Sequence, residues 1–457
     1  MVKIITENET LEVLEKHKEE YYMKGIYFVP KEKYKTLIKN PKMSDFEQGE
    51  LPNCGILAAF AALYSRPEFF EEIYPKVVRI NKSVKLQCKM FRNGEQVILR
   101  MNNTLPFYKG GSFLLYARSH RHSDLYLAAI LEKAFVILAC NYSYKGCIGL
   151  HPGFLFRSFS DSMIGERIWS KEQSKEDLME YIKREYHNKS SVVLAVSQRF
   201  DLKPEQEDQR FHAFALRDYS EGFVKLYEPN CAPDWCISNV NLPSQLKNTA
   251  DRDQGELWVT TEDFENRKVY VTSLYSKKLY RHVFKIVGQL KLSDKEKIIS
   301  KAAFRVNVKK TTRFMINFFS TIFNKTDLEF EVTIADPYIQ KIDLKLETDQ
   351  GSYMNWNLNQ KLNERQIWIK KFTLEPHTYN FCVHRKFVKE NLTPEENTFL
   401  ASQEEEHYHF RIASTSEFEF KEISYEHATS LIQEIEQKFE EMKLSNVGDD
   451  GNSNVNV

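Results

Sequence analysis

One cysteine in the chain stands where a helix could activate it. Cys54 follows Pro52-Asn53 and directly precedes a run of mostly apolar, helix-forming residues, GILAAFAALY. At the first turn of a helix, free N–H groups and the positive end of the helix dipole stabilise a thiolate, and a nearby imidazolium lowers the thiol pKa further. The placement therefore fits a nucleophile, although on its own it fits a small buried core residue equally well.

The elements that would position Cys54 are helices. The helix that begins at Cys54 has a buried stripe with offsets of 0, 1, 4, 7 and 8 residues, formed by Ile56, Leu57, Phe60, Leu63 and Tyr64. Similar spacing predicts a second helix over residues 124–140, and residues 8–20 also read as helical. We therefore expect the first 150 residues to be largely helical.

The periodicity changes to that of strands after about residue 190. Strands are predicted over residues 191–197, 211–217, 222–228 and 256–261, and the second of these begins with Phe211 and His212. Beyond residue 300, about eight strands separated by polar or turn segments predict a β-sandwich. An amphipathic helix is expected over residues 428–442, followed by a disordered tail, GDDGNSNVNV.

Four segments carry a specific resemblance. A helical lobe with a cysteine, followed by a sheet lobe with a histidine, is the arrangement of papain-type cysteine proteases. Four segments of the sequence resemble segments of the calpain family, and they keep the family's order and approximate spacing over residues 45–275. The segments are QGELPNCGILAAFAAL (48–63), LPFYKGGSFLLYARS (105–119) with ILEKAFVILACNYS (130–143), HAFALRDY (212–219) and QGELWVTTEDF (254–264). FTLEPHTYNFCV and HFRIAST are more weakly similar to the β-sandwich that follows the calpain core.

The resemblance implies a fold class and four domains. The class is α+β, with a two-lobed papain-like core and a β-sandwich after it. The expected segments are a helical lobe with Cys54 (1–158), a sheet-rich lobe with His212 (159–275), the β-sandwich (276–424) and the C-terminal helix with its tail (425–457).

The resemblance also implies a set of catalytic residues. Cys54 would be the nucleophile, His212 its base, and Gln48 the side-chain donor to the oxyanion. The family's third residue is an asparagine, whereas the aligned run here is LYEPNCAPDW. Either Glu228 takes this position, since a carboxylate can also orient and stabilise an imidazolium, or Asn230 reaches in after a local shift.

Three departures from the family pattern bear on activity. Gly55 replaces the tryptophan after the nucleophile, and Phe211 replaces the glycine before the histidine. Ser160-Asp161-Ser162 replaces a Thr-Gly-Gly that lines the cleft. Because glycines at such positions leave room for a substrate backbone, Phe211 would crowd the peptide unless its ring turns away. Two functions therefore remain: a cysteine endopeptidase, or a pseudopeptidase that binds partner proteins without cutting them.

Calcium is the one cofactor that the resemblance allows, and no organic cofactor is expected. The family core holds one ion in each lobe, and binding draws the lobes together. Asp45 and Asp124 match the first site, and Asp234 and Glu256 match the second, where Gln254 and Asn241 stand in place of acids. Each lost carboxylate weakens attraction for a hard dication. EF-hand loops of the DxDxDG type are absent from the sequence.

Composition narrows the class of partner. Lys and Arg together number 64, as do Asp and Glu, so no net field favours nucleic acid. The start of the chain lacks the apolar core of a signal peptide, no window is apolar enough to span a membrane, and the seven cysteines contain no CxxC pair. We expect a cytoplasmic protein with reduced thiols that acts on proteins. Peripheral membrane contact through the β-sandwich stays open, and the acidic run 393–407 reads mainly as solvated. The HxH pairs His120/His122 and His407/His409 read as strand or loop residues rather than metal ligands.

Overall fold

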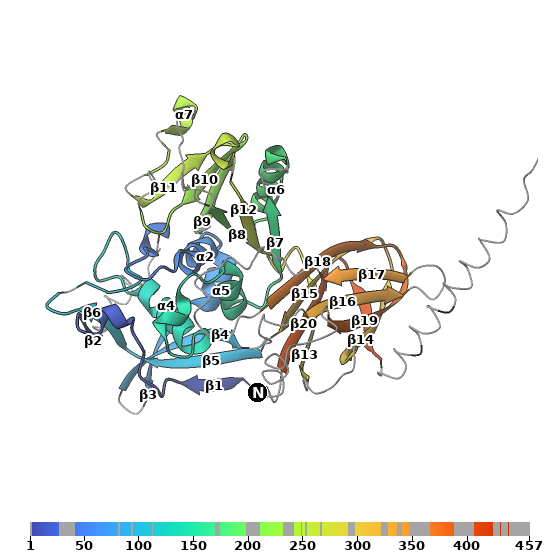
Figure 1. Ribbon diagram of the computed structural model, residues 1–457, viewed down its shortest axis with the longest axis horizontal. Coiled ribbons are helices and arrows are strands. Elements are labelled where there is room, and N and C mark those ends of the chain that lie inside the picture. Colours follow the sequence, from blue (N-terminus) through green and yellow to red (C-terminus); the bar gives the residue numbers. More distant parts are fainter. Residues whose placement is uncertain are drawn as a thin grey trace, which may run out of the picture. The chain divides into compact units, whose positions relative to one another are not determined.

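The computed structural model divides into two compact units, Met1–Leu279 and a second that begins at Tyr280. Each is described by itself (Figure 1). The residues that the structure describes are 2–26, 42–80, 83–92, 95–111, 113–169, 174–197, 211–231, 242–247, 249–251, 254–265, 267–290, 298–320, 328–335, 341–346, 366–387, 406–423, 430 and 437.

The first unit contains a four-stranded sheet that the sequence reading missed. Its order is β1 (Lys3–Thr6), β5 (Glu95–Asn102), β4 (Ser83–Arg92) and β3 (Lys76–Ile80). Leu86, Cys88 and Met90 alternate with more exposed residues along β4, which is the period of a half-buried strand. The expectation of a largely helical first 150 residues was therefore wrong.

Residues 8–20 also differ from their predicted helix. They contain only a short 3-10 turn, η1 (Glu15–His17), before β2 (Tyr21–Gly25), which pairs with β6 (Thr104–Tyr108). Leu11, Val13 and Leu14 are all buried, and the backbone of Glu12 exchanges hydrogen bonds with Tyr142 and Tyr144. These tertiary contacts override the helical propensity of the segment.

Helices surround the start of the candidate site. They are α2 (Cys54–Tyr64), α3 (Pro67–Ile73), α4 (Leu127–Ala139) and α5 (Pro152–Phe159). Every residue of α2 from Cys54 to Leu63 is buried, because α2 contacts α5 on one side and strands of the second sheet on the other (Figure 1). A helix that is apolar all round belongs in a core, and this one fixes the position of its first residue. The helices predicted at Cys54 and at 124–140 are confirmed within a few residues.

The second sheet of this unit has six antiparallel strands. Their order is β11 (Glu256–Val259), β10 (Phe223–Tyr227), β9 (Phe211–Ser220), β8 (Ser191–Ser197), β12 (Val269–Leu274) and β7 (Ile164–Trp169). The helix α6 (Lys175–His187) packs Leu178, Met179 and Ile182 into one hydrophobic cluster with β8, β9 and β12. Short elements complete the unit: η2 (Met43–Asp45), η3 (Tyr144–Cys147), α7 (Ser244–Lys247) and η6 (Glu262–Phe264). The four strands predicted between residues 191 and 261 are confirmed.

The second unit is built from antiparallel strands in two sheets. One sheet has the order β13 (His282–Leu290), β20 (Glu406–Ser414), β15 (Thr312–Ser320), β18 (Gln366–Leu374). The other has the order β17 (Lys341–Leu346), β16 (Leu328–Ala335), β19 (His377–Phe387), β14 (Ile298–Val308), β21 (Phe418–Glu422). The eight strands predicted beyond residue 300 all correspond to observed strands.

Two predicted features lie wholly or largely outside the described residues. They are the helix over 428–442, of which only Ser430 and Gln437 are described, and the tail from residue 448. Among the described residues, no helix combines the length and the apolar character needed to cross a membrane. The structure is thus an α+β protein with mainly antiparallel sheets.

Candidate active site

The helix start at Cys54 is held by a buried side-chain contact. Asn53 is the residue that caps α2, and its side-chain Nδ2 donates a 2.7 Å hydrogen bond to Oε1 of Glu132 on α4. The other oxygen of Glu132 accepts a 3.1 Å hydrogen bond from the backbone N–H of Ala117. Asn53 and Glu132 are both buried, so the residue before the cysteine is held by a carboxylate that is itself anchored to the main chain at Ala117.

Cys54 and His212 form a coupled pair. Cys54 is 6% exposed, and its side chain hydrogen-bonds to His212, the second residue of β9. Burial alone would raise the pKa of the Cys54 thiol, but the His212 imidazolium and the N–H groups of Ala213 and Gly55 lower it below its ordinary value. A lowered thiol pKa next to an imidazolium is the condition for a thiolate nucleophile.

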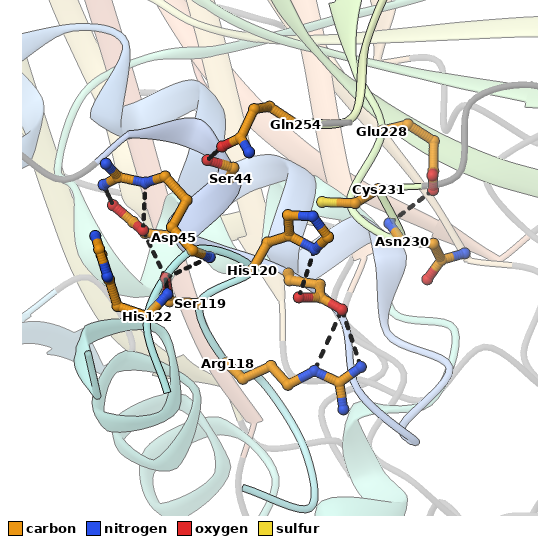
Figure 2. A network of polar contacts seen from close by, with 12 residues as sticks. Ser44, Asp45, Arg118, Ser119, His120, His122, Glu228, Asn230, Cys231 and Gln254 are labelled. Atoms are coloured by element: carbon orange, nitrogen blue, oxygen red, sulfur yellow. Dashed lines mark hydrogen bonds and ion pairs between the residues drawn. The ribbon is translucent and has the colours of Figure 1, made fainter. Parts of the chain in front are cut away.

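Glu228 lies on the far side of the imidazole. Its Oε1 atom is 2.5 Å from Nε2 of His212, and Glu228 is completely buried at the end of β10. Burial opposes a charged histidine, but the Cys54 thiolate and the Glu228 carboxylate outweigh it and raise the pKa of His212 to about 10. The same Glu228 oxygen accepts a 2.8 Å hydrogen bond from the backbone N–H of Asn230 (Figure 2). Of the two candidates for the third position, Glu228 is thus the one hydrogen-bonded to His212, while Asn230 supports that carboxylate through its main chain.

Gln48 is held close to the same segment. Its backbone N–H donates a 2.8 Å hydrogen bond to the carbonyl of Pro229, the residue after Glu228. On another side, Gly49 lets the chain pass close to the backbone of Tyr116, because a Cβ atom there would lie 2.2 Å from the carbonyl oxygen of Tyr116. The side-chain Oε1 of Gln48 is buried and has no hydrogen-bond partner within the described part of the chain. Most buried polar atoms have a hydrogen-bond partner, so this oxygen is an exception.

Two of the departures from the family pattern have a structural reason. A Cβ atom at Gly55 would lie 2.4 Å from the carbonyl oxygen of Leu150, so the loop before α5 leaves no room there for a side chain. Phe211 is buried, and its ring packs edge-on against Tyr270 of β12 with centroids 5.1 Å apart. The Phe211 ring is therefore accommodated in the core of its own sheet.

The third departure lies where α5 ends. Ser160 and Ser162 are buried, and the backbone N–H of Ser162 donates to Oγ of Ser160 at 3.1 Å. The carboxylate of Asp161 lies 2.8 Å from Nζ of Lys277. This segment therefore has side chains engaged in contacts, one of them with a distant part of the sequence, where the family has glycines.

Two of the candidate calcium ligands, Asp45 and Glu256, face basic side chains in the described part of the chain. Asp45 is fully buried and its carboxylate contacts the guanidinium of Arg121, while Asp124 is exposed at the surface. Glu256 lies 2.6 Å from Nζ of Lys225, and Asp234 lies outside the described residues. Within the described chain no group of three or more His, Cys, Asp or Glu side chains could hold a metal ion. The side chains present at Asp45 and Glu256 do not fit a calcium ion, because each carboxylate already faces a fixed cation.

The structure describes the two HxH pairs in different settings. Nδ1 of His120 lies 3.3 Å from Oε2 of Glu47, and His122 is exposed. His407 and His409 lie on strand β20, as the reading of strand residues predicted.

Sequence reasoning missed two groups in this region, Glu132 and Arg121. An acid within the apolar run of α4, ILEKAF, is itself a signal, because an unpaired carboxylate is rarely buried. Arg121 stands in an ordinary polar stretch, ARSHRHSD, and its partner Asp45 is 76 residues away. A contact of that kind becomes visible only in three dimensions.

Comparison with known proteins agrees with this geometry. The model of the calpain family cysteine proteases matches residues 21–272, which is more than half of the chain. Calpain-12 of Homo sapiens is 24% identical over 250 residues, covering 50% of this chain and 34% of that protein. Calpain-8 of Rattus norvegicus is 23% identical over 247 residues (48% and 34%), and Calpain-A of Drosophila melanogaster 21% over 252 residues (49% and 29%).

These matches span about a third of the length of the curated relatives. Among solved structures, the mosquito-larvicidal Cry4Aa toxin from Bacillus thuringiensis aligns with 50% of this chain and 42% of its own, at 9% identity. Its TM-score of 0.17 is too low to support any argument. The match of the family model over residues 21–272 shows that this chain is a divergent member of the calpain family of cysteine proteases.

Proposed function

We propose that the protein is a calpain-like cysteine endopeptidase that cleaves proteins, with Cys54 as nucleophile and His212 as its base. The observation that carries the proposal is the unbroken chain of contacts from the Cys54 thiol through His212 to the buried Glu228 carboxylate. Cys54 begins α2, while His212 on β9 and Glu228 just after β10 come from a pair of neighbouring strands, so folding brings a helix start against this hairpin. The lowered pKa of Cys54 and the raised pKa of His212 are the shifts that a thiolate–imidazolium pair requires.

The reaction follows from these positions. The Cys54 thiolate attacks the carbonyl carbon of the scissile peptide, and His212 gives its proton to the leaving amine as the C–N bond breaks. A water molecule then attacks the thioester while His212 takes up its proton, releasing the acid and restoring the thiolate. The backbone N–H of Cys54 and the side-chain amide of Gln48 are the proposed donors to the oxyanion, and one such donor typically contributes about 3 kcal/mol.

The domain organisation is part of the same proposal. We assign residues 1–158 and 159–275 to the two lobes of the protease core, and 276–424 to a calpain-type β-sandwich. Support for the sandwich comes from aromatic contacts between the sheets of the second unit, such as Phe304 of β14 and Phe410 of β20 with ring centroids 5.4 Å apart. A cytoplasmic location and protein substrates complete the proposal, and peripheral membrane contact would involve the β-sandwich.

Cleavage of an unfolded protein tests the activity. We expect the full-length chain under reducing conditions to degrade casein into discrete fragments, and Cys54→Ser and His212→Ala each to abolish the cleavage. If wild type and Cys54→Ser both leave casein intact while the chain still captures protein partners, the pseudopeptidase alternative is correct.

A further inference from the structure

The carboxylate of Asp45 has every hydrogen-bonding position occupied. Oδ2 accepts a 2.6 Å hydrogen bond from the backbone N–H of Lys42 and contacts Nη2 of Arg121. Oδ1 accepts from Oγ of Ser119 at 2.6 Å and from Nε of Arg121 at 3.1 Å (Figure 2). Calcium requires six to eight oxygen ligands, and charged ones above all. An ion at Asp45 would have to displace the guanidinium and then remain beside it.

Hydrogen bonds to Ser119 fix the backbone of the loop that carries Arg121. Oγ of Ser119 accepts hydrogen bonds from the backbone N–H groups of Arg121 and His122, both at 3.2 Å, while donating to Asp45. This turn places the guanidinium against a carboxylate that is fully buried. A buried carboxylate needs a paired cation, since leaving it unpaired is costly.

Glu256 likewise faces basic side chains at the position where the family pattern implies a calcium ligand. Its Oε2 atom lies 2.6 Å from Nζ of Lys225, and its Oε1 atom lies 3.5 Å from Nε of Arg217. Nζ of Lys225 also donates to the carbonyl of Thr249 at 2.7 Å, which holds the ammonium in place. Gln254, two residues earlier, contributes a neutral amide rather than a charge.

A direct hydrogen bond joins these two regions. Oγ of Ser44, next to Asp45, donates to Oε1 of Gln254 at 2.6 Å (Figure 2). Together with the bond from Gln48 N–H to the Pro229 carbonyl, it ties the segment before Cys54 to the segments that follow β10 and precede β11. Direct hydrogen bonds within the chain therefore hold the segment before Cys54 against the segments that flank β10 and β11.

We propose that Arg121 and Lys225 are resident cations that replace calcium in this protease core, so that the site assembles without calcium. This inference rests on the proposed function of Cys54 and His212. It departs from what the family implies, and it concerns the regulation of the same site.

Calcium binding by the full-length chain tests the inference without relying on activity. After treatment with a chelator, the chain should give no binding heat in isothermal calorimetry with calcium at about 5 mM, above the Kd of weak protein sites. Its unfolding midpoint should shift by less than about 1 °C, whereas a ligand at many times its Kd would raise it by several degrees. Specific binding with such a rise would overturn the inference.

Labelling of Cys54 by a thiol-reactive peptide chloromethyl ketone supplies the link to function. We expect equal rates in chelator and in calcium for wild type and for the control Arg92→Gln, which changes an exposed arginine of β4. In Arg121→Gln, the rate in chelator should fall by on the order of ten- to a hundredfold, because a small displacement of the reacting groups is costly. Arg121→Lys, which keeps the charge, should retain most of the rate.

The labelling has three outcomes that contradict the inference and one that contradicts the proposed function. A wild type that needs calcium for labelling contradicts the inference, as does Arg121→Gln if it folds and matches Arg92→Gln. Should Arg121→Gln fail to fold, a slow rate in Arg121→Lys that only calcium restores would also contradict it. If wild-type Cys54 reacts in neither condition, the proposed function fails, while the calorimetry and the unfolding midpoint still decide whether calcium binds.

Discussion

Nε2 of His212 and Oε1 of Glu228 lie 2.5 Å apart at a buried position, and the carboxylate takes the place of an amide in the aligned family pattern. An amide oxygen at this place accepts a hydrogen bond and no more. A carboxylate also carries a charge that favours the imidazolium. The difference predicts how activity depends on pH.

Glu228→Gln should narrow the pH range of activity. The pKa of His212 is raised to about 10, partly by Glu228, so the thiolate–imidazolium pair persists until the pH rises through that value. Without the charge the pKa of His212 falls, and the basic limb of the profile of kcat/KM should move down by about one unit or more. Glu228→Asn should behave like Glu228→Gln, whereas Glu228→Ala should reduce kcat by on the order of a hundredfold, since it removes the group that orients the imidazole. An unchanged basic limb in Glu228→Gln would show that the charge has no part in catalysis.

Ionisation of the buried Glu132 should destabilise the folded state as the pH rises, and Glu132→Gln should remove this effect. Burial raises the pKa of Glu132 to about 7, although Asn53 and Ala117 hydrogen-bond to it. The unfolded state holds the ordinary lower pKa, so the folded state loses stability on going from below pH 4.5 to above pH 7. At about 1.4 kcal/mol per pKa unit, the loss is of order 3 kcal/mol.

The measurement is the free energy of unfolding by urea across this pH range. The free energy of unfolding of wild type should fall relative to that of Glu132→Gln as the pH rises, since the variant has no carboxyl to ionise. The exposed acid Glu95 supplies the control, and Glu95→Gln should follow wild type throughout. Parallel curves for wild type and Glu132→Gln would mean that Glu132 ionises normally.

Gly55→Ala should destabilise the protein, because its Cβ would lie 2.4 Å from the Leu150 carbonyl oxygen. Overpacking of this kind typically costs about 1–3 kcal/mol. Gly25→Ala is the matched control, because a Cβ there would meet nothing within 4 Å. If both alanine variants unfold at the same urea concentration, the loop before α5 yields easily and Gly55 is not required by packing.

Phe211→Ala should weaken the fold rather than improve catalysis. The Phe211 ring is buried against Tyr270, and removal of such a ring typically costs about 3–5 kcal/mol. Because the ring packs within its own sheet, its loss should leave KM for a peptide substrate unchanged. A KM that falls markedly in Phe211→Ala would show that the ring obstructs the substrate.

Periodicity predicted the elements whose burial follows a simple pattern. The helix at Cys54 and the strands from residue 191 onward were predicted because runs of apolar residues have one dominant period. The strands over residues 76–102 were missed although Leu86, Cys88 and Met90 alternate with Lys85, Gln87 and Lys89, which is the period of a half-buried strand. Residues 8–20 carry good helix formers, but the structure buries Leu11, Val13 and Leu14 beside residues 142–144.

The candidate site was predictable only in part, for a physical reason. Cys54 and His212 lie in short segments with characteristic neighbours, so the resemblance located them. The choice between Glu228 and Asn230 depends on how the chain turns after β10 ends at Tyr227. Strand periodicity does not decide it, because residues two apart in a strand point to the same side. The contact of Arg121 with Asp45 depends on a turn formed by Ser119, which no local pattern encodes.

The reactivity of Cys54 relative to Cys231 in the same chain tests the central claim most directly. Burial raises the pKa of the Cys231 thiol to about 12, whereas the pKa of Cys54 is lowered, so at about pH 7 their thiolate fractions should differ by several orders of magnitude. Mass spectrometry after brief exposure to the peptide chloromethyl ketone should find Cys54 labelled at least about a hundredfold faster than Cys231, with the advantage lost in His212→Ala. Labelling of Cys54 no faster than that of Cys231, or equally fast in His212→Ala, would contradict the account.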